Sequence, residues 1–212
     1  MNALDCQHLG LIDYCVSSEH FELMINRLKD MTWQSNKAMN NTAVKALLLE
    51  LDSIDRDEMP ASQLDDVQQQ IESLFPADAA DKGQPGLSQH EYRCNQLQGI
   101  SERFEALESD NPWLMQGRDN FLKGCPATAH LIMNQLQQGK DLSLKEVAQY
   151  ELVLALQSVR HPDFAEGIRA MVVDKDYKPR WQHEHVSMVP KDWIDEFYRP
   201  VWQGPDHPFR DL

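Results

Sequence analysis

The chain has 212 residues, of which 42% are hydrophobic, enough for one sizeable domain or two small ones. A formal net charge of −14 argues against nucleic acid as a partner, because phosphate backbones require a basic protein face. No stretch approaches the roughly 18 apolar residues of a membrane-spanning helix, and MNALDCQHLG at the N-terminus does not resemble a signal peptide. We therefore expect a cytoplasmic protein with no nucleic-acid or membrane partner.

The first third of the chain is predicted to be mostly helical. LIDYCV, residues 11–16, is the one convincing strand candidate. Thr42 is expected to cap a helix with apolar residues at helical spacing. Ser62 opens a Ser-x-x-Asp cap, and apolar residues then recur at helical spacing over 64–75 until Pro76 ends the helix.

Helical signals also dominate the rest of the chain, after a stretch at about 76–87 that reads as a surface linker. Pro126 suits a first helical turn and Gly139 a helix end. Between them an apolar stripe is expected to face the core: Ala129, Ile132, Met133 and Leu136. Capping boxes are predicted at Ser88–Glu91, Ser143–Glu146 and Asp163–Glu166. The fold class predicted from these signals is mainly α, with at most one or two short strands near the N-terminus.

Residue types that often carry chemistry are scattered. The four cysteines form no CxxC pair, which is typical of reduced thiols. His183 and His185, at i and i+2, would share a face only on a strand, and no third ligand is spaced nearby, so we predict no metal site. The nine glycines do not cluster as a phosphate cradle or a backbone oxyanion hole usually requires. We predict no catalytic residue within this chain.

A basic cluster near residue 175 stands out in so acidic a chain. Arg169, Lys175, Lys178 and Arg180 are followed by Trp181. Cations at a helix C-terminus are stabilising without any ligand, and Trp181 could simply cover the core. The alternative is a binding site for an anionic ligand with a flat ring. The residues alone leave both interpretations open.

The same stretch, DFAEGIRAMVVDKDYKPRW, resembles the C-terminal signature of the crotonase superfamily, and within it that of the 3-hydroxyisobutyryl-CoA hydrolases. The signature reads Asp-Phe-x-Glu-Gly-Val-Arg-Ala, then an aliphatic pair, Asp-Lys-Asp and Pro-Lys/Arg-Trp. Ile168 takes the place of the valine. The matching residues are Asp163, Phe164, Glu166, Gly167, Arg169, Ala170, Asp174, Lys175, Asp176, Pro179 and Trp181.

Other segments extend the resemblance. Glu151 stands where that branch carries a glutamate, and KGCPATAHL, residues 123–131, is similar to its Ser-Pro-Thr-Ser segment, with Cys125 replacing the serine. MNALDCQHLGLIDYCV resembles the family's Asn-Ala helix and following strand, departing at Asp5-Cys6, where an Asp-Ala pair is usual. Residues from about 36 to 111 match only in helical character. The expected domains are therefore the end of a crotonase-like core at 1–35 and a helical C-terminal region at 36–212.

The resemblance implies that the catalytic half, with its glycine-rich oxyanion-hole loops, lies upstream of this segment. The chain is then the C-terminal half of a 3-hydroxyisobutyryl-CoA hydrolase-like thioesterase of valine catabolism and is inactive alone. No permanently bound cofactor is implied, and acyl-CoA is the substrate of the full-length enzyme. Lys175, Lys178, Arg180 and Trp181 are the CoA-contacting residues that it implies.

Two other functions remain open: a fragment of an enoyl-CoA hydratase or isomerase, and a non-enzymatic helical interaction module. A chain separated from its upstream half would also expose apolar surface. We therefore expect self-association.

Overall fold

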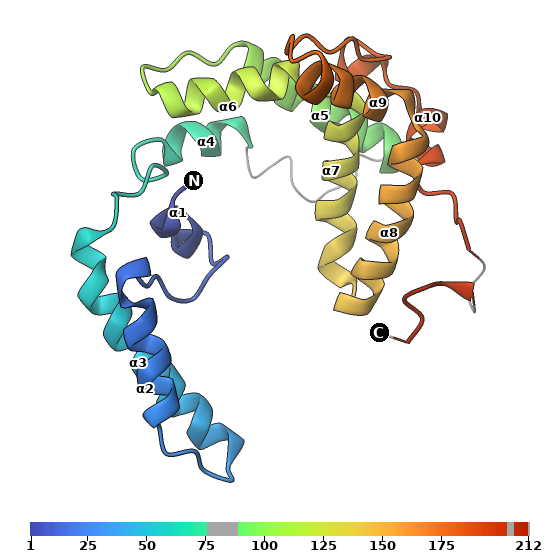
Figure 1. The fold of residues 1–212 in the computed structure, drawn as a ribbon. Helices are drawn as coiled ribbons and strands as arrows, with labels where there is room; N and C mark the ends of the chain where they lie inside the picture. Colours follow the sequence, from blue (N-terminus) through green and yellow to red (C-terminus); the bar gives the residue numbers. More distant parts are fainter. Residues whose placement is uncertain (76–88, 203–205, 212) are drawn as a thin grey trace. The chain divides into compact units, whose positions relative to one another are not determined.

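The structure is a computed structural model that describes residues 1–75, 89–202 and 206–211. In these residues the chain forms ten α-helices and no β-strand (Figure 1), which confirms the mainly helical fold class. The chain divides into two compact units, residues 1–71 and 72–212. A functional division after residue 35 stays a prediction. The linker at about 76–87 and the capping box at Ser88–Glu91 lie outside the residues and side chains that the structure describes.

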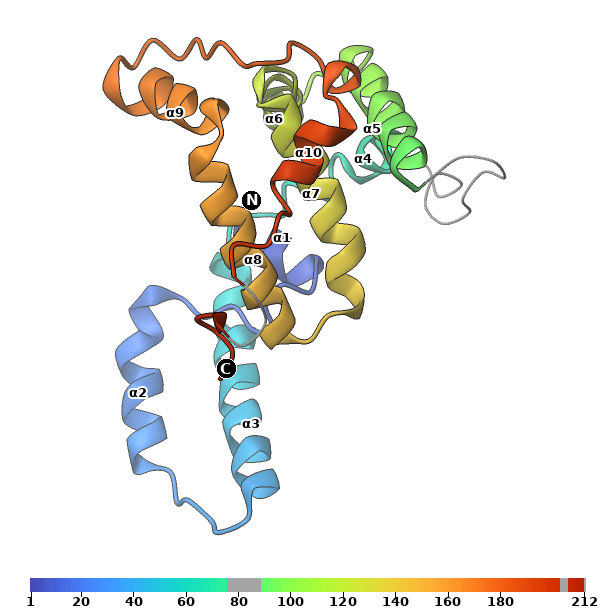
Figure 2. The same cartoon turned by 90° about the vertical axis from the view of Figure 1, so that its right-hand side faces the viewer.

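The first unit is built on a pair of helices, α2 (Phe21–Asp30) and α3 (Lys37–Asp55), which run side by side in opposite directions (Figure 2). An ion pair between Arg27 and Glu50 joins them at 2.7 Å. The helix predicted to begin at Thr42 begins earlier, because the side chain of Asn36 accepts a hydrogen bond from the backbone N–H of Ala38 and caps it there. Thr42 lies inside α3, where its hydroxyl donates to the carbonyl of Ala38.

The strand predicted at residues 11–16 was wrong: in the described part of the chain this segment pairs with no other strand. Carboxylates of α3 take the place of a partner strand. Asp52 accepts the backbone N–H of Cys15 at 2.8 Å, and Asp55 accepts that of Ser17 at 2.6 Å. An isolated apolar run of this length does not distinguish a strand from an extended segment docked on side chains.

A buried carboxylate also holds the short helix α1 (Ala3–His8). Asn2 and Asp5 form a reciprocal capping box, and Asp5 accepts three further hydrogen bonds, from the Ser62 hydroxyl and the backbone N–H groups of Gln63 and Leu64. The Ser62 hydroxyl also accepts the backbone N–H of Asp65 at 3.4 Å, as in the predicted cap, but the residues that follow form turns and the helix begins later. That helix, α4, spans Gln68–Leu74.

The second unit contains α5 (Gln89–Glu105), α6 (Pro112–Lys123), α7 (Pro126–Gln138), α8 (Leu144–Arg160), α9 (Pro162–Ile168) and α10 (Lys191–Glu196). Both views show α7 and α8 as antiparallel neighbours (Figures 1 and 2). The first-turn proline of α7 and the Ser143–Glu146 capping box of α8 are confirmed. Residues of α7, α8 and the segment around α10 form the core: Ala127, Leu131, Leu154, Val189, Ile194 and Phe197.

The apolar stripe predicted on α7 does not face this core. Ile132 and Leu136 are 50% and 64% exposed, and the stripe lines a groove of about 320 Å³ with residues of α5 and α6. The buried face carries His130 and Asn134 beside Ala127 and Leu131. Both polar side chains are satisfied there, with His130 Nε2 2.8 Å from the carbonyl oxygen of Val186 and Asn134 donating to the Tyr198 hydroxyl at 3.1 Å.

Candidate ligand-binding turn

The capping box predicted at Asp163–Glu166 would start a helix at about Phe164, but helix α9 begins two residues earlier, at Pro162, and the predicted box was wrong. Because Pro162 occupies the first turn, Asp163 lies inside the helix and is free to bond elsewhere. Asp163 accepts the backbone N–H of Gln182 at 2.8 Å, and Glu166 accepts that of Arg180 at 2.7 Å. These carboxylates attach the returning chain to α9.

The turn that makes this return possible starts with five residues of π-helix, Arg169–Val173. The backbone N–H of Asp174 donates to the carbonyl of Arg169 at 2.8 Å, and that of Tyr177 donates to Ala170 at 3.1 Å. Lys175 and Tyr177 then adopt left-handed backbone conformations, with φ of 53° and 56°. Non-glycine residues rarely adopt this region, so surrounding contacts must hold the turn in shape.

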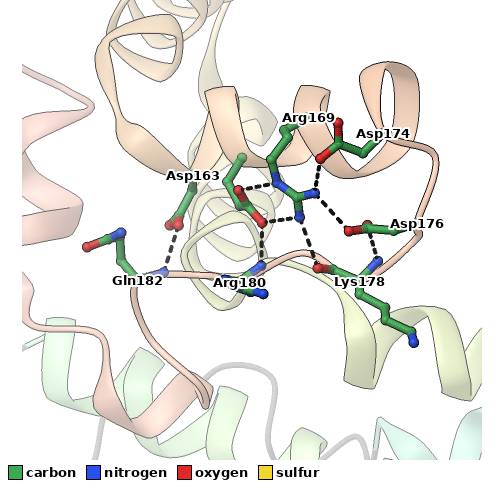
Figure 3. Close-up of polar contacts among 8 residues, drawn as sticks. Asp163, Arg169, Asp174, Asp176, Lys178, Arg180 and Gln182 are labelled. Atoms are coloured by element: carbon green, nitrogen blue, oxygen red, sulfur yellow. Dashed lines mark hydrogen bonds and ion pairs between the residues drawn. The ribbon is translucent and has the colours of Figure 1, made fainter.

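Arg169 supplies those contacts (Figure 3). Its guanidinium donates two bonds to Glu166 at 2.9 and 2.7 Å, and one each to Asp174 at 2.6 Å and Asp176 at 2.8 Å. A fifth bond, of 3.2 Å, reaches the carbonyl of Lys178. We call Arg169 and these three carboxylates the Arg169 hub.

The hydrogen bonds of the hub shift the pKa of Glu166, Asp176 and Arg169. Hydrogen bonds from Arg169, and then from the backbone of Arg180, lower the pKa of Glu166 to about 2. Bonds from Arg169 and from the backbone of Lys178 lower the pKa of Asp176, while the three carboxylates raise that of Arg169. Glu166, Asp176 and Arg169 are therefore charged at neutral pH. Arg169 is engaged internally and is not a candidate ligand contact.

The other members of the basic cluster are differently placed. Lys175, Lys178 and Arg180 are exposed, and within the described part of the chain their side chains form no ion pair. Figure 3 shows the Lys178 side chain pointing away from Arg169. The predicted cluster therefore separates into one structural arginine and three accessible cations. The role of Glu166 was missed, because its partner Arg180 lies 14 residues further on.

Trp181 is half-buried beside α9. Its indole N–H donates to the carbonyl of Lys123 at 3.0 Å, and its ring lies so close to Gly167 that a Cβ there would be 3.4 Å away. The ring forms part of the wall of a cavity of about 360 Å³, lined by residues that include Cys125, His161 and Asp163. Trp181 thus has a packing role whether or not it also contacts a ligand.

The polar residues of this cavity are not arranged as an activated nucleophile. The Cys125 thiol donates to Asp163 at 3.5 Å, and burial raises its pKa, which disfavours the reactive thiolate. His161 stacks on Phe197 with ring centroids 3.7 Å apart, and burial lowers its pKa. No group of three potential metal ligands occurs among the residues that the structure describes. His185, from the predicted pair of histidines, instead bonds Glu105 at 3.1 Å and Ser187 at 2.8 Å.

The chain is similar to proteins of one family over most of its length. Residues 1–198 match the family described as Enoyl-CoA hydratase/isomerase. The chain is 29% identical to the mitochondrial 3-hydroxyisobutyryl-CoA hydrolase of Gallus gallus over 54% of this chain and 31% of that protein. It is 22% identical to the corresponding protein of Dictyostelium discoideum over 91% of this chain and 44% of that one.

A solved enoyl-CoA hydratase from Rhodobacter sphaeroides shares the fold, with a TM-score of 0.63 and 21% identity over 95% of this chain and 48% of that chain. The chain thus spans less than half the length of each of these relatives. None of the helices in the described residues is both long and apolar enough to cross a membrane. With residues 1–198 matched, the chain belongs to the enoyl-CoA hydratase/isomerase family.

Proposed function

We propose that this chain is the C-terminal, CoA-contacting part of an acyl-CoA thioesterase related to the 3-hydroxyisobutyryl-CoA hydrolases. The observation that carries the proposal is the turn after α9, where three exposed cations extend from one short loop held by the Arg169 hub. The two hydrolases named above support the choice of reaction. A role in valine breakdown, which the resemblance of the sequence implies, belongs to the same proposal.

The turn suits part of an anionic ligand. Lys175, Lys178 and Arg180 provide ammonium and guanidinium donors for phosphate oxygens, and such charge-assisted bonds are stronger than neutral ones. Trp181 offers an aromatic surface beside them for a flat ring such as adenine. CoA combines these features, and in this proposal it enters as part of the substrate and is not a resident cofactor.

The chemical step is assigned to the other part of such an enzyme. Thioester hydrolysis needs donors fixed at the developing oxyanion and an acid or base within reach of the attacking water. Asp163 and Glu166 hold the returning chain, and the glycines do not cluster into an oxyanion hole. We therefore expect these 212 residues alone to release no thiol from 3-hydroxyisobutyryl-CoA, with the Gallus gallus hydrolase as a positive control. Comparable turnover by this chain would place the active site within it.

Calorimetric titration of the chain with CoA tests the binding role. Arg180→Glu should weaken binding about tenfold or more, because it replaces an attractive charge with a repulsive one. Lys140→Glu is the control, since it changes the net charge equally at an exposed lysine outside the turn. The difference between the variants should shrink as salt rises and screens the exposed charges. Equal CoA affinities of Arg180→Glu and Lys140→Glu would show that the basic cluster only stabilises the end of the helix.

The alternatives give different results. A fragment of an enoyl-CoA hydratase or isomerase would also bind CoA. Extended by its upstream half, however, it would hydrate or isomerise an enoyl-CoA and would release no thiol. A non-enzymatic helical module would not bind CoA.

Light scattering tests the separate expectation of self-association, and a strict monomer at high concentration would contradict it.

A further inference from the structure

The Arg169 hub adds side-chain bonds to the two backbone hydrogen bonds that join the end of α9 to the turn after it. Arg169 and Glu166 lie at the end of α9, whereas Asp174, Asp176 and Lys178 belong to the turn. One planar guanidinium bonds to all of them, which a lysine could not do, because its ammonium has three donors and no fork geometry.

The turn is strained where the hub holds it. Lys175 and Tyr177, the neighbours of Asp176 on either side, both have positive φ, and such conformations persist only when surrounding contacts fix them. Asp176 bonds Arg169 through one oxygen and the backbone N–H of Lys178 through the other. The clamp on Asp176 therefore holds both strained residues in place.

The hub also offsets a charge conflict. Asp174 and Asp176 lie in the same turn as Lys175 and Lys178, so their carboxylates would repel an anion that approached these lysines. Arg169 binds both carboxylates at 2.6 and 2.8 Å. This arrangement directs the acidic groups of the turn toward the hub and leaves the lysine side chains outside it.

We propose that Arg169 is a positioning residue: by clamping Glu166, Asp174 and Asp176 it holds the turn in the one shape that presents Lys175, Lys178 and Arg180 to a phosphate-bearing ligand. This inference rests on the proposed CoA-binding function. Loss of the clamp would leave the binding shape only fractionally populated, and the apparent affinity would fall by that fraction.

Two substitutions separate positioning from charge. Arg169→Lys keeps the charge and removes the fork, and we expect it to weaken CoA binding about tenfold. Asp176→Asn removes a negative charge beside the cations, so electrostatics alone predicts tighter binding, whereas a positioning role predicts weaker binding. Arg160→Lys, at an exposed arginine that ends α8, is the matched control and should bind CoA as the unmodified chain does.

A second measurement follows the turn without any ligand. Trypsin should cleave after Lys175 faster in Arg169→Lys and Asp176→Asn than in the control, while the far-ultraviolet circular dichroism of all variants stays the same. A loss of helix in these variants, or an unchanged cleavage rate, would overturn the inference.

The binding outcomes are also distinct. If the unmodified chain binds CoA and Asp176→Asn binds it more tightly, the inference fails while the proposed function stands. If the unmodified chain does not bind CoA at all, both fail.

Discussion

Replacing Asp5 with alanine should destabilise the first unit strongly. Asp5 is 0% exposed and accepts four hydrogen bonds, from the Asn2 N–H at 2.6 Å, the Ser62 hydroxyl at 2.9 Å, and the Gln63 and Leu64 N–H groups at 2.7 and 3.2 Å. A donor left buried without an acceptor costs about 1–3 kcal/mol. Because some donors will reach water, we expect Asp5→Ala to lower the free energy of unfolding by about 3–5 kcal/mol.

The geometry also predicts an order among variants. Three of the four bonds end on Oδ1 and one on Oδ2, so Asp5→Asn keeps the carbonyl-like acceptor and loses only the Asn2 bond, at about 1–3 kcal/mol. Asp13→Ala, at an exposed aspartate of the same unit, is the control and should change stability by less than about 0.5 kcal/mol. Urea denaturation measures the difference, and hydrogen exchange at the Gln63 and Leu64 amides localises it. Equal stability of Asp5→Ala and Asp13→Ala would refute this account of α1.

Two further substitutions test the second unit. Burial lowers the pKa of His161, so the unfolded chain binds more protons at this residue than the folded chain does. Stability should therefore fall as the pH drops from about 7 to 5. The urea midpoint of His161→Phe should depend less on pH than that of the unmodified chain, and an equal pH dependence would contradict this. Gly167→Ala should be tolerated or raise the melting temperature, because its Cβ would meet Trp181 at 3.4 Å, an ordinary contact, and alanine favours a helix over glycine by up to about 1 kcal/mol. A clear loss of stability on thermal melting would show that the indole has no room to adjust.

The features predicted correctly from the sequence are those whose signal is local. The box at Ser143–Glu146 and the first-turn position of Pro126 depend on residues within one helical turn. Asp163 and Glu166 show the same local spacing, but their partners lie 19 and 14 residues away, and nothing in the sequence distinguishes such a contact from a cap.

For the same reason, the basic cluster could be located from the sequence but the internal role of Arg169 could not, and CoA contact by Lys175, Lys178, Arg180 and Trp181 stays a prediction. The number of cations in the sequence located the basic cluster but included Arg169 in it. The sequence does not show that Glu166, Asp174 and Asp176 all bond to this arginine. The strand at 11–16 failed because strand formation depends on a partner, and the side chains of Asp52 and Asp55 bond this segment instead. Such pairings are properties of the fold and not of a local window.

Helix α7 has apolar residues on two sides, so two orientations about its own axis would each bury an apolar face. Turning the stripe of Ile132 and Leu136 inward would bury more apolar area, which alone would favour that orientation. It would also remove His130 and Asn134 from the Val186 carbonyl and the Tyr198 hydroxyl, at about 1–3 kcal/mol for each group left unsatisfied. The two polar residues thus favour one orientation of the helix about its axis and contribute to the uniqueness of the fold.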